Sequence, residues 1–278
     1  MKADTRNGLP HDGTAQAHFS HYAAPLIDSA LACAAALHSN PDAEVLHKLR
    51  VSLRRLRTLL WAYRPLLDEQ FDNQQRALFK FYASAAGKTR DWDILIALLD
   101  ETGDGQEKPG DALQAARAKT FETSRTTLEQ ADVKRALRET LKEANRELNT
   151  AHKRTPLPKF ARKRLAAAQK SMTKRMKRAA RAKRSDYASY HEVRKAGKKL
   201  RYLIEFFEPM LAKKQRKATK PLKRLQKRFG ALNDVVASEQ LLRDNQQTLY
   251  ADDTAAAHAL DALAQERKRR MRDAGKLL

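Results

Sequence analysis

A block of one histidine and three basic residues occurs twice in the chain, and this internal repeat limits the possible folds more than any other feature. The spacing of His47, Arg50, Arg54 and Arg57 is the same as that of His191, Arg194, Lys198 and Arg201. The shift is 144 residues at all four positions. Downstream, residues 87–91 match residues 230–234 with a shift of 143. A duplicated structural unit is therefore expected, with one copy in each half of the chain.

The sequence predicts an all-α fold. Glycine and proline are scarce, at 9 residues each, which excludes collagen-like and turn-rich all-β classes. Apolar residues recur every three or four positions, and no run alternates with period two. Candidate helices cover about 15–38, 42–63, 68–86, 90–100, 111–151, 158–184, 187–208, 210–229, 232–248 and 253–273, or about five helices in each half.

The strongest break in the helical pattern is Thr155-Pro156-Leu157-Pro158, between the two copies of the repeat. We expect residues 1–13 to form a flexible tail and residues 14–278 to form one domain, with a first helical half at 14–154 and a second at 155–278. The start of the chain has no apolar signal region, and no stretch approaches the ~20 apolar residues of a membrane helix. This favours a cytoplasmic protein without a membrane partner.

The formal net charge of +23 is carried by the second half alone. Residues 1–150 contain 21 basic and 21 acidic side chains, whereas residues 151–278 contain 35 basic and 12 acidic ones. So much local charge repels itself unless an anion lies against it. Nucleic acid, an acidic membrane surface or another polyanion are therefore the candidate partners.

Each repeated helix combines an apolar face with a basic face. At about 100° per residue, the four repeat positions share a sector of about 80°, and Leu49, Leu53 and Leu56 lie opposite. A basic face in solvent is usually interleaved with acids, but residues 45–67 contain none. The first copy therefore favours an anion site. In the second copy, Glu192 and Glu205 could pair with the basic residues, so a solvated face is a stronger alternative there.

Two further basic rows follow the same helical spacing. The first contains Lys163, Lys170, Lys174, Lys177, Arg181 and Arg184, and the second contains Lys213, Lys217, Lys220, Arg224 and Lys227. Residues 162–184 hold 11 basic side chains and no acid. If two helical bundles face each other, these rows can converge on one cleft. A long, flexible chain of phosphates fits such a cleft, because each residue contributes a donor for phosphate oxygens.

These motifs resemble those of the CHAD domain family, the conserved-histidine α-helical domains. The resemblance is carried by residues 47–57, 87–93, 191–202 and 225–234, in the family's order. It implies two pseudo-symmetric helical bundles that face each other across a basic central channel. It also implies inorganic polyphosphate as the ligand and a location at polyphosphate granules. Many members carry a triphosphate-hydrolysing tunnel domain, but its Glu-x-Glu-x-Lys strand is not found here, so we expect a stand-alone module.

The resemblance also assigns the site. It places the first copy of the repeat on one wall of the channel and the second on the other. Lys88 and Arg90 lie at a helix start, where backbone N–H groups favour anions. The predicted polyphosphate-binding residues are His47, Arg50, Arg54, Arg57, Lys88, Arg90, Lys170, Lys174, Lys177, Arg181, His191, Arg194, Lys195, Lys198, Arg201, Lys220, Arg224 and Lys227.

We expect no catalytic residue, metal site or cofactor, and therefore no enzyme. Neither repeat histidine has a nucleophile at a suitable spacing, and Asp91, Asp93 and Asp234 are expected to pair with bases or cap a helix. Neighbouring bases should lower the pKa of both histidines. Each either donates to phosphate or pins a neighbouring helix. Nonspecific nucleic-acid binding is the alternative function. The sequence speaks against it, because no helix-turn-helix, zinc or RNP signature is found. The oligomeric state is left open.

Overall fold

The computed structural model describes residues 13–39, 42–102, 110–183, 186–211, 216 and 219–278, and the predicted all-α fold is confirmed: the described part contains no strand. Most of the predicted tail lies outside these residues, as do Arg184, Lys213 and Lys217. No described helix is long and apolar enough to cross a bilayer. The helices are α1 (Ala15–Ser39), α2 (Ala43–Tyr63), α3 (Glu69–Ala85), α4 (Lys88–Thr102), α5 (Gly110–Gln130), α6 (Val133–Thr150), α7 (Leu157–Arg181), α8 (Tyr187–Phe206), α10 (Thr219–Leu249) and α11 (Asp253–Gly275).

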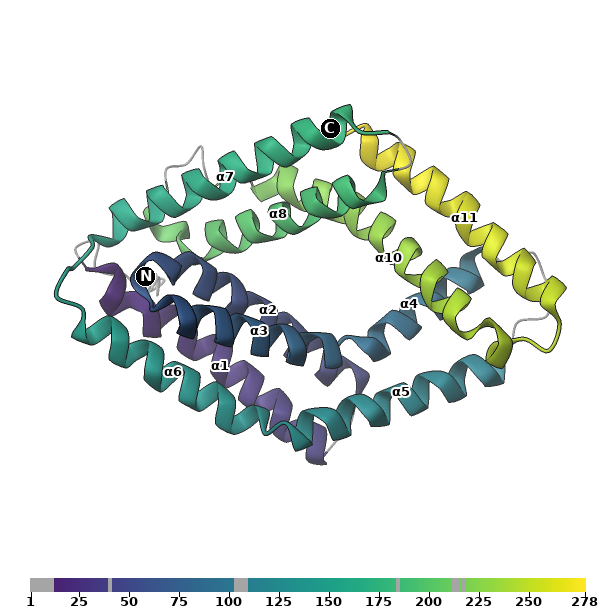
Figure 1. The fold of residues 1–278 in the computed structure, drawn as a ribbon, viewed down its shortest axis with the longest axis horizontal. Coiled ribbons are helices and arrows are strands. Elements are labelled where there is room, and N and C mark those ends of the chain that lie inside the picture. Colours follow the sequence, from purple (N-terminus) through teal and green to yellow (C-terminus); the bar gives the residue numbers. More distant parts are fainter. Residues whose placement is uncertain (1–12, 40–41, 103–109, 184–185, 212–215, 217–218) are drawn as a thin grey trace, which may run out of the picture.

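The helices are arranged as an outer frame around an inner set (Figure 1). Helices α5, α6, α7 and α11 follow the outline of the molecule, and α2, α3, α8 and α10 lie within it. Inside the frame, α2 contacts α8, and α4 packs along α10. Elements from the two halves of the chain therefore meet in the middle of the molecule.

The helices of the two halves follow one another at nearly the offset of the sequence repeat. From α1 to α7 the start shifts by 142 residues, from α2 to α8 by 144, and from α5 to α11 by 143. Helices α3 and α4 together take the place of the long α10, and α6 has no such partner. This order fits the duplication inferred from the repeats, which stays a prediction.

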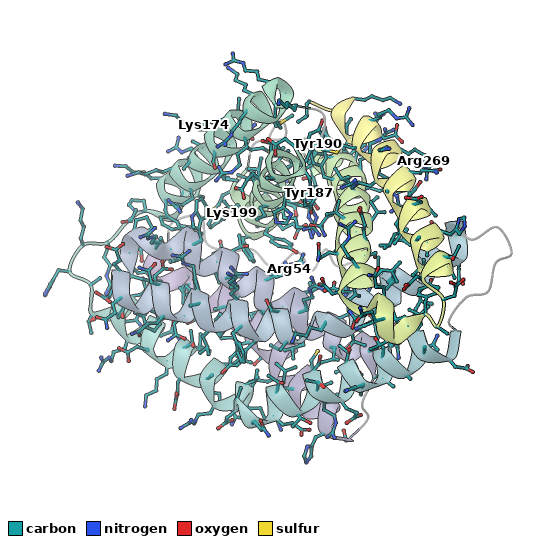
Figure 2. All side chains as sticks on the ribbon, turned by 45° about the vertical axis from the view of Figure 1, so that its right-hand side comes forward. Arg54, Lys174, Tyr187, Tyr190, Lys199 and Arg269 are labelled. Atoms are coloured by element: carbon teal, nitrogen blue, oxygen red, sulfur yellow. The ribbon has the colours of Figure 1, made fainter. Side chains whose placement is uncertain are left out.

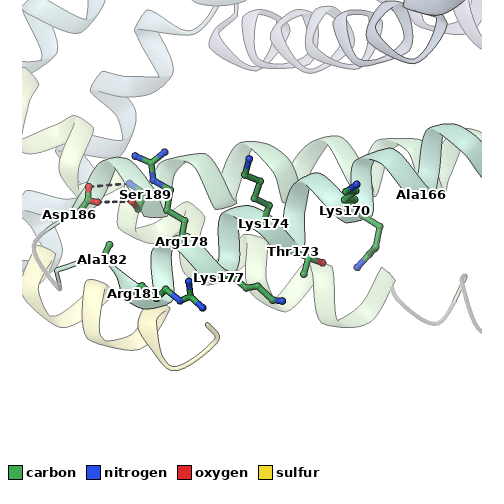
Figure 3. A pocket seen from close by; sticks show the side chains of 11 residues that line it. Ala166, Lys170, Thr173, Lys174, Lys177, Arg178, Arg181, Ala182, Asp186 and Ser189 are labelled. Atoms are coloured by element: carbon green, nitrogen blue, oxygen red, sulfur yellow. Dashed lines mark hydrogen bonds between the residues drawn. The ribbon is translucent and has the colours of Figure 1, made fainter.

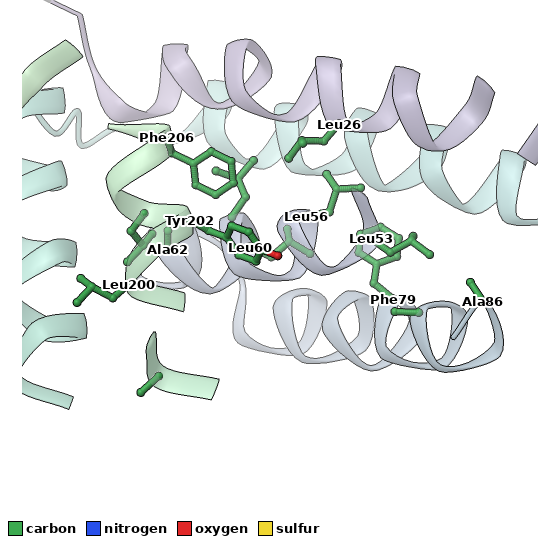
Figure 4. Packing of buried hydrophobic residues seen from close by; sticks show 14 of the residues in the cluster. Leu26, Leu53, Leu56, Leu60, Ala62, Phe79, Ala86, Leu200, Tyr202 and Phe206 are labelled. Atoms are coloured by element: carbon green, nitrogen blue, oxygen red, sulfur yellow. The ribbon is translucent and has the colours of Figure 1, made fainter. Parts of the chain in front are cut away.

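One continuous hydrophobic core joins the two halves. Leu53, Leu56 and Leu60 of α2 are buried between α1 and α3 and beside Phe206 of α8 (Figure 4). Aromatic rings from both halves extend this core. The ring centroid of Phe160, on α7, lies 4.8 Å from that of Tyr63, on α2. The apolar face predicted for α2 is thus the face that is packed.

The N-terminal ends of α1 and α7 are tied together by backbone hydrogen bonds. Ala15 N donates to Thr155 O at 2.8 Å, and Leu157 N donates to Gly13 O at 3.0 Å. Gln16 adds its side chain, whose amide donates to Lys153 O at 2.8 Å. These bonds hold the starts of the two halves side by side.

The prediction of one helix over 111–151 is wrong, because the chain breaks between α5 and α6. Asp132 adopts a left-handed conformation with φ of 43°. Its carboxylate accepts a hydrogen bond from Arg135 N at 3.2 Å and so caps α6. A short polar side chain tolerates this conformation and offers the backbone a competing bond, which an amphipathic pattern does not reveal.

The prediction of separate helices over 210–229 and 232–248 is also wrong. Helix α10 runs without interruption from Thr219 to Leu249 and passes through Gly230. Glycine inside a helix costs only about 1 kcal/mol. Phe229 and Leu232 on either side of it are fully buried, and their packing outweighs that cost.

The two glycines of the repeat differ in their surroundings, and this difference predicts opposite effects on stability. A Cβ atom on Gly87 would lie 2.6 Å from Arg50 Cζ, whereas one on Gly230 would have no neighbour within 4 Å. Gly87→Ala should therefore displace the Arg50 guanidinium and lower the free energy of unfolding by about 1–2 kcal/mol. Gly230→Ala should raise it by about 0.5–1 kcal/mol through the helix propensity of alanine. Urea unfolding of both variants measures the difference; equal effects would contradict it.

Candidate functional site

Two adjoining chambers between the halves of the molecule form what we call the central cavity. The Trp61 chamber has a volume of about 440 Å³ and is lined from α2, α3, α7 and α8. The Asp234 chamber has a volume of about 520 Å³ and is lined from α2, α4, α8 and α10. The two share the side chains of Arg50, Arg54, Arg194, Lys198 and Tyr202.

The amphipathic pattern of α2 and α8 aims the cationic side chains into this cavity. Leu49 and Leu53 of α2 are buried, as are Val193 and Leu200 of α8. The opposite, basic faces of the two helices are therefore left to line the cavity. Figure 2 shows Arg54 and Lys199 toward the middle of the molecule, while Lys174 and Arg269 lie on its outer side.

The cavity lining is strongly unbalanced in charge. The two chambers together are lined by 13 lysines and arginines but by only 3 acids, Asp91, Glu192 and Asp234. Glu192 is already held by Lys195 and, at 3.3 Å, by Arg175. The positive potential inside the cavity is therefore not cancelled by its own walls, and an anion placed there gains from it.

Hydrogen bonds orient the central arginines before any ligand arrives. Arg50 Nη1 donates to Gly87 O at 3.1 Å and lies 3.4 Å from an Asp91 carboxylate oxygen. Arg54 Nη2 donates to the hydroxyl of Tyr202, on α8, at 2.9 Å. Each arginine is thus fixed to an element other than its own helix. A guanidinium that is held in place loses less entropy when it binds an anion.

In three other arginines of the cavity, Arg57, Arg194 and Arg201, the buried Nε atom has no hydrogen-bond partner among the described residues. Arg201 is nevertheless ion-paired, since its Nη1 lies 3.2 Å from a Glu205 carboxylate oxygen. Burial, followed by the repulsion of neighbouring arginines, lowers the pKa of Arg57. Burial also lowers the pKa of Arg194, where Asp234 acts in the opposite direction. Desolvated, mutually repelling cations are a free-energy cost that a bound anion offsets.

The charge of Lys198 is strongly perturbed by its surroundings. Burial, and then the repulsion of Arg54 and Arg194, lowers its pKa to about 6. The adjacent Lys199 has a pKa lowered to about 8, mainly by burial and then by Arg175. Its ammonium lies 4.1 Å from the Trp61 ring centroid. An anion in the cavity favours the protonated form of both lysines.

The two repeat histidines have different environments. His191 Nδ1 lies 3.0 Å from Asn233 Oδ1 and 3.2 Å from the Tyr187 hydroxyl, so this histidine connects α8 to α10. His47 Nδ1 is buried and has no partner in the described residues. The pKa of each is lowered, and burial rather than the neighbouring bases is the largest cause. The helix-pinning role left open by the sequence thus has a structural basis at His191 but not at His47.

The structure brings together most, but not all, of the predicted site residues. Three of them, Lys88, Lys220 and Arg224, are exposed and line neither chamber. The residues that line the central cavity are His47, Arg50, Arg54, Arg57, Arg90, His191, Arg194, Lys195, Lys198, Arg201 and Lys227.

The basic row of α7 lies on a separate surface, so the predicted convergence of all rows on one cleft is not found. Leu165, Ala168 and Met172 are buried, and this packing against α8 turns the row outward. Lys170, Lys174, Lys177, Arg178 and Arg181 line an outer groove of about 1060 Å³, here called the α7 groove (Figure 3). This groove and the central cavity have no lining residue in common.

The central cavity is also lined by four cationic side chains that were not among the predicted site residues: Arg76, Arg175, Lys199 and Lys223. Arg76 is held by the buried Asp72, whose carboxylate accepts from Arg76 Nε at 2.9 Å. The spacing of Asp72 and Arg76, four residues apart on a helix, was a usable signal for this pair. Arg175 belongs to a different face of α7 from the predicted row, so nothing in the spacing marked it.

Among the residues that the structure describes, no group of three His, Cys, Asp or Glu side chains is placed to hold a metal ion. Asp91, which lies beside the repeat arginine Arg50, has a pKa raised by burial, an effect that Arg50 opposes. The described cavity offers fixed cations that can bind an anion.

The low pKa of Lys198 predicts how stability changes with pH. Unfolding returns this pKa from about 6 to 10.5, so the unfolded chain binds one more proton between these values. Stability should therefore rise with pH across this window. Urea unfolding of the wild type and of Lys198→Met at several pH values tests this. The unfolding free energy of the wild type, relative to that of the variant, should increase as pH rises from 6 to 10. A difference independent of pH would contradict the assignment.

Comparison with known proteins agrees with the all-α fold. A sequence model of the CHAD domain matches residues 21–243. The crystal structure of the CHAD domain from the plant Ricinus communis is similar, with a TM-score of 0.80 and 23% identity, over 98% of this chain and 94% of that chain. PptA from Streptomyces chartreusis is similar with a TM-score of 0.69 and 17% identity, over 95% of this chain and 98% of that one.

At these identities the two structures are evidence of a shared fold. A search of curated proteins gave no match. The family match covers most of the chain and includes both copies of the histidine and arginine repeat. The chain belongs to the CHAD domain family.

Proposed function

We propose that this protein binds inorganic polyphosphate in the central cavity and does not transform it. The observation that carries the proposal is the convergence of 13 lysines and arginines on two joined chambers with only 3 acids. Each phosphate unit of such a chain is anionic and accepts charge-assisted hydrogen bonds. Release of counterions from the polymer adds to the affinity. The resemblance of the repeat motifs to the CHAD family implies the same ligand.

The lining of the cavity favours an unbranched phosphate chain over a nucleic acid. Single-stranded nucleic acid is usually held by bases that stack on aromatic rings. The Trp61 ring is already contacted by Lys199 at 4.1 Å and by the Arg164 guanidinium at 4.2 Å. Tyr202 is buried, with Arg201 4.9 Å from its ring centroid. The aromatic side chains of the cavity are thus engaged, and its cations remain the ligand-binding groups.

The acids of the cavity support a binding role. Asp91 lies against Arg50, and Glu192 is held between Arg175 and Lys195. These two carboxylates balance and position cations, and the third acid, Asp234, acts electrostatically on both Arg194 and Asp91. With polyphosphate as its ligand, the protein would collect where the polymer collects, at polyphosphate granules in the cytoplasm.

A competition experiment tests this function. Long polyphosphate should displace single- and double-stranded DNA from the protein at matched salt, and its affinity should fall steeply as salt rises. Binding is measured by fluorescence anisotropy, with free phosphate assayed in the same samples. Preference for either DNA would reject polyphosphate as the ligand. Release of phosphate that depends on a divalent metal would reject the absence of catalysis.

The variant Arg54→Gln/Arg194→Gln tests the site. It removes two central charges without reversing them, and each charge-assisted hydrogen bond contributes about 1.5–3 kcal/mol. Polyphosphate affinity should fall about 100-fold or more, while circular dichroism shows unchanged helix content. The control Lys134→Gln/Arg138→Gln changes two exposed cations of α6 and should bind like the wild type. Equal losses in both variants would mean that binding is a diffuse property of the charged surface.

A further inference from the structure

We propose that a polyphosphate chain that fills the central cavity continues over the outer surface of α7, so that one long chain is bound at two separate segments. The second segment is the α7 groove. This inference rests on the proposed function and adds to it a second site and a dependence of affinity on chain length.

The cations of the α7 groove are free to bind a ligand. Lys170, Lys174, Lys177, Arg178 and Arg181 are all exposed, and none of them makes an ion pair or hydrogen bond with another described residue. The acid that lines the groove, Asp186, caps the start of α8, and its pKa is lowered by its hydrogen bonds to Ser189 and, to a smaller extent, by nearby Arg178. It therefore balances part of the charge at one end of the groove. Its carboxylate accepts hydrogen bonds from Ser189 N at 3.2 Å and from Ser189 Oγ at 2.6 Å (Figure 3).

The spacing of these cations is unfavourable without an anion. Residues 170, 174, 178 and 181 succeed one another at intervals of four or three positions, and like charges at these intervals repel on a helix. They extend over about 16 Å of α7 at 1.5 Å per residue. The groove has space for a ligand, and small side chains such as Ala166 and Ala182 line it. A linear polyanion lying along α7 would relieve this repulsion at each turn.

The groove and the central cavity lie on neighbouring flanks of the same helix. Ala168, Ser171 and Arg175 of α7 line the Trp61 chamber, and Lys174 and Arg178 line the groove. Around the helix axis, Arg178 is about 60° from Arg175. Because a helix is about 10–12 Å wide, a chain that leaves the chamber needs to pass only a short arc before it meets the groove.

This continuity favours the same polymer over a second partner. Exposed lysines make individually weak contacts with an anion. A chain whose other segment is already held in the cavity presents its phosphates to the groove at a high effective concentration, so that weak contacts become useful. Glu192, the acid beside this route, is neutralised by Arg175 and Lys195. The cavity therefore acts as the primary site, and the groove adds affinity for chains long enough to reach it.

Two ligands and two matched variants test the proposal. Tripolyphosphate is too short to extend from the central cavity to the α7 groove. A long polyphosphate of narrow length distribution can occupy both. The groove variant carries Lys170→Gln, Lys174→Gln, Lys177→Gln and Arg181→Gln. The control variant removes the same number of exposed cations from α5 and α6 by Lys119→Gln, Lys134→Gln, Arg138→Gln and Lys142→Gln. Calorimetry at fixed salt measures each affinity, and circular dichroism checks the fold.

The groove variant should bind tripolyphosphate within about twofold of the wild type but lose about tenfold in affinity for the long chain. The control should keep both affinities. A groove variant that binds the long chain as tightly as the wild type would overturn the inference. Failure of the wild type to bind either polyphosphate would instead reject the proposed function itself.

Discussion

Apolar packing that holds mutually repelling cations together is the interaction on which the site depends. Leu49 and Leu53 on α2 and Val193 and Leu200 on α8 are almost completely buried, and such burial contributes about 25 cal/mol for each Å² removed from water. This packing fixes the opposite faces of both helices toward the cavity, whatever the charges there prefer. The repulsion between those charges is thereby stored in the folded protein and becomes available as binding free energy for an anion.

The two copies of the repeat differ in how they hold their charges. In the first copy, Arg50 is bonded to Gly87 and Asp91. At the matching place in the second copy, Arg194 has a buried Nε without a partner among the described residues, and a Cβ atom on Gly230 would meet nothing within 4 Å. At this repeat position the first copy is thus organised in advance, whereas the second keeps an unfilled donor. A ligand that contacts both arginines meets one that is already held and one that can still gain a hydrogen bond.

The central cavity and the α7 groove use positive charge in different ways. In the cavity, burial lowers the pKa of Lys198 to about 6, so part of its charge appears only when an anion enters. In the groove the cations are exposed and screened by solvent, and each is individually weak. A chain anchored in the first environment and extended into the second is held at one segment and gains affinity as it becomes long enough to reach the other. Arg175 and Arg178, on neighbouring flanks of one helix, connect the two.

The all-α fold, the repeat and the basic faces of α2 and α8 could be predicted from the amino-acid order, because helical periodicity depends only on residues three and four positions apart. Family membership followed from the same motifs. Only the tertiary structure decided that α7 turns its basic row outward, that Arg76 and Arg175 join the cavity, and that α10 runs through Gly230. These outcomes depend on which faces pack together and on contacts between segments far apart in the chain. The charge state of Lys198 was also decided by the tertiary structure. Lys198 lies on α8, and its pKa is lowered by its burial and by Arg54 of α2.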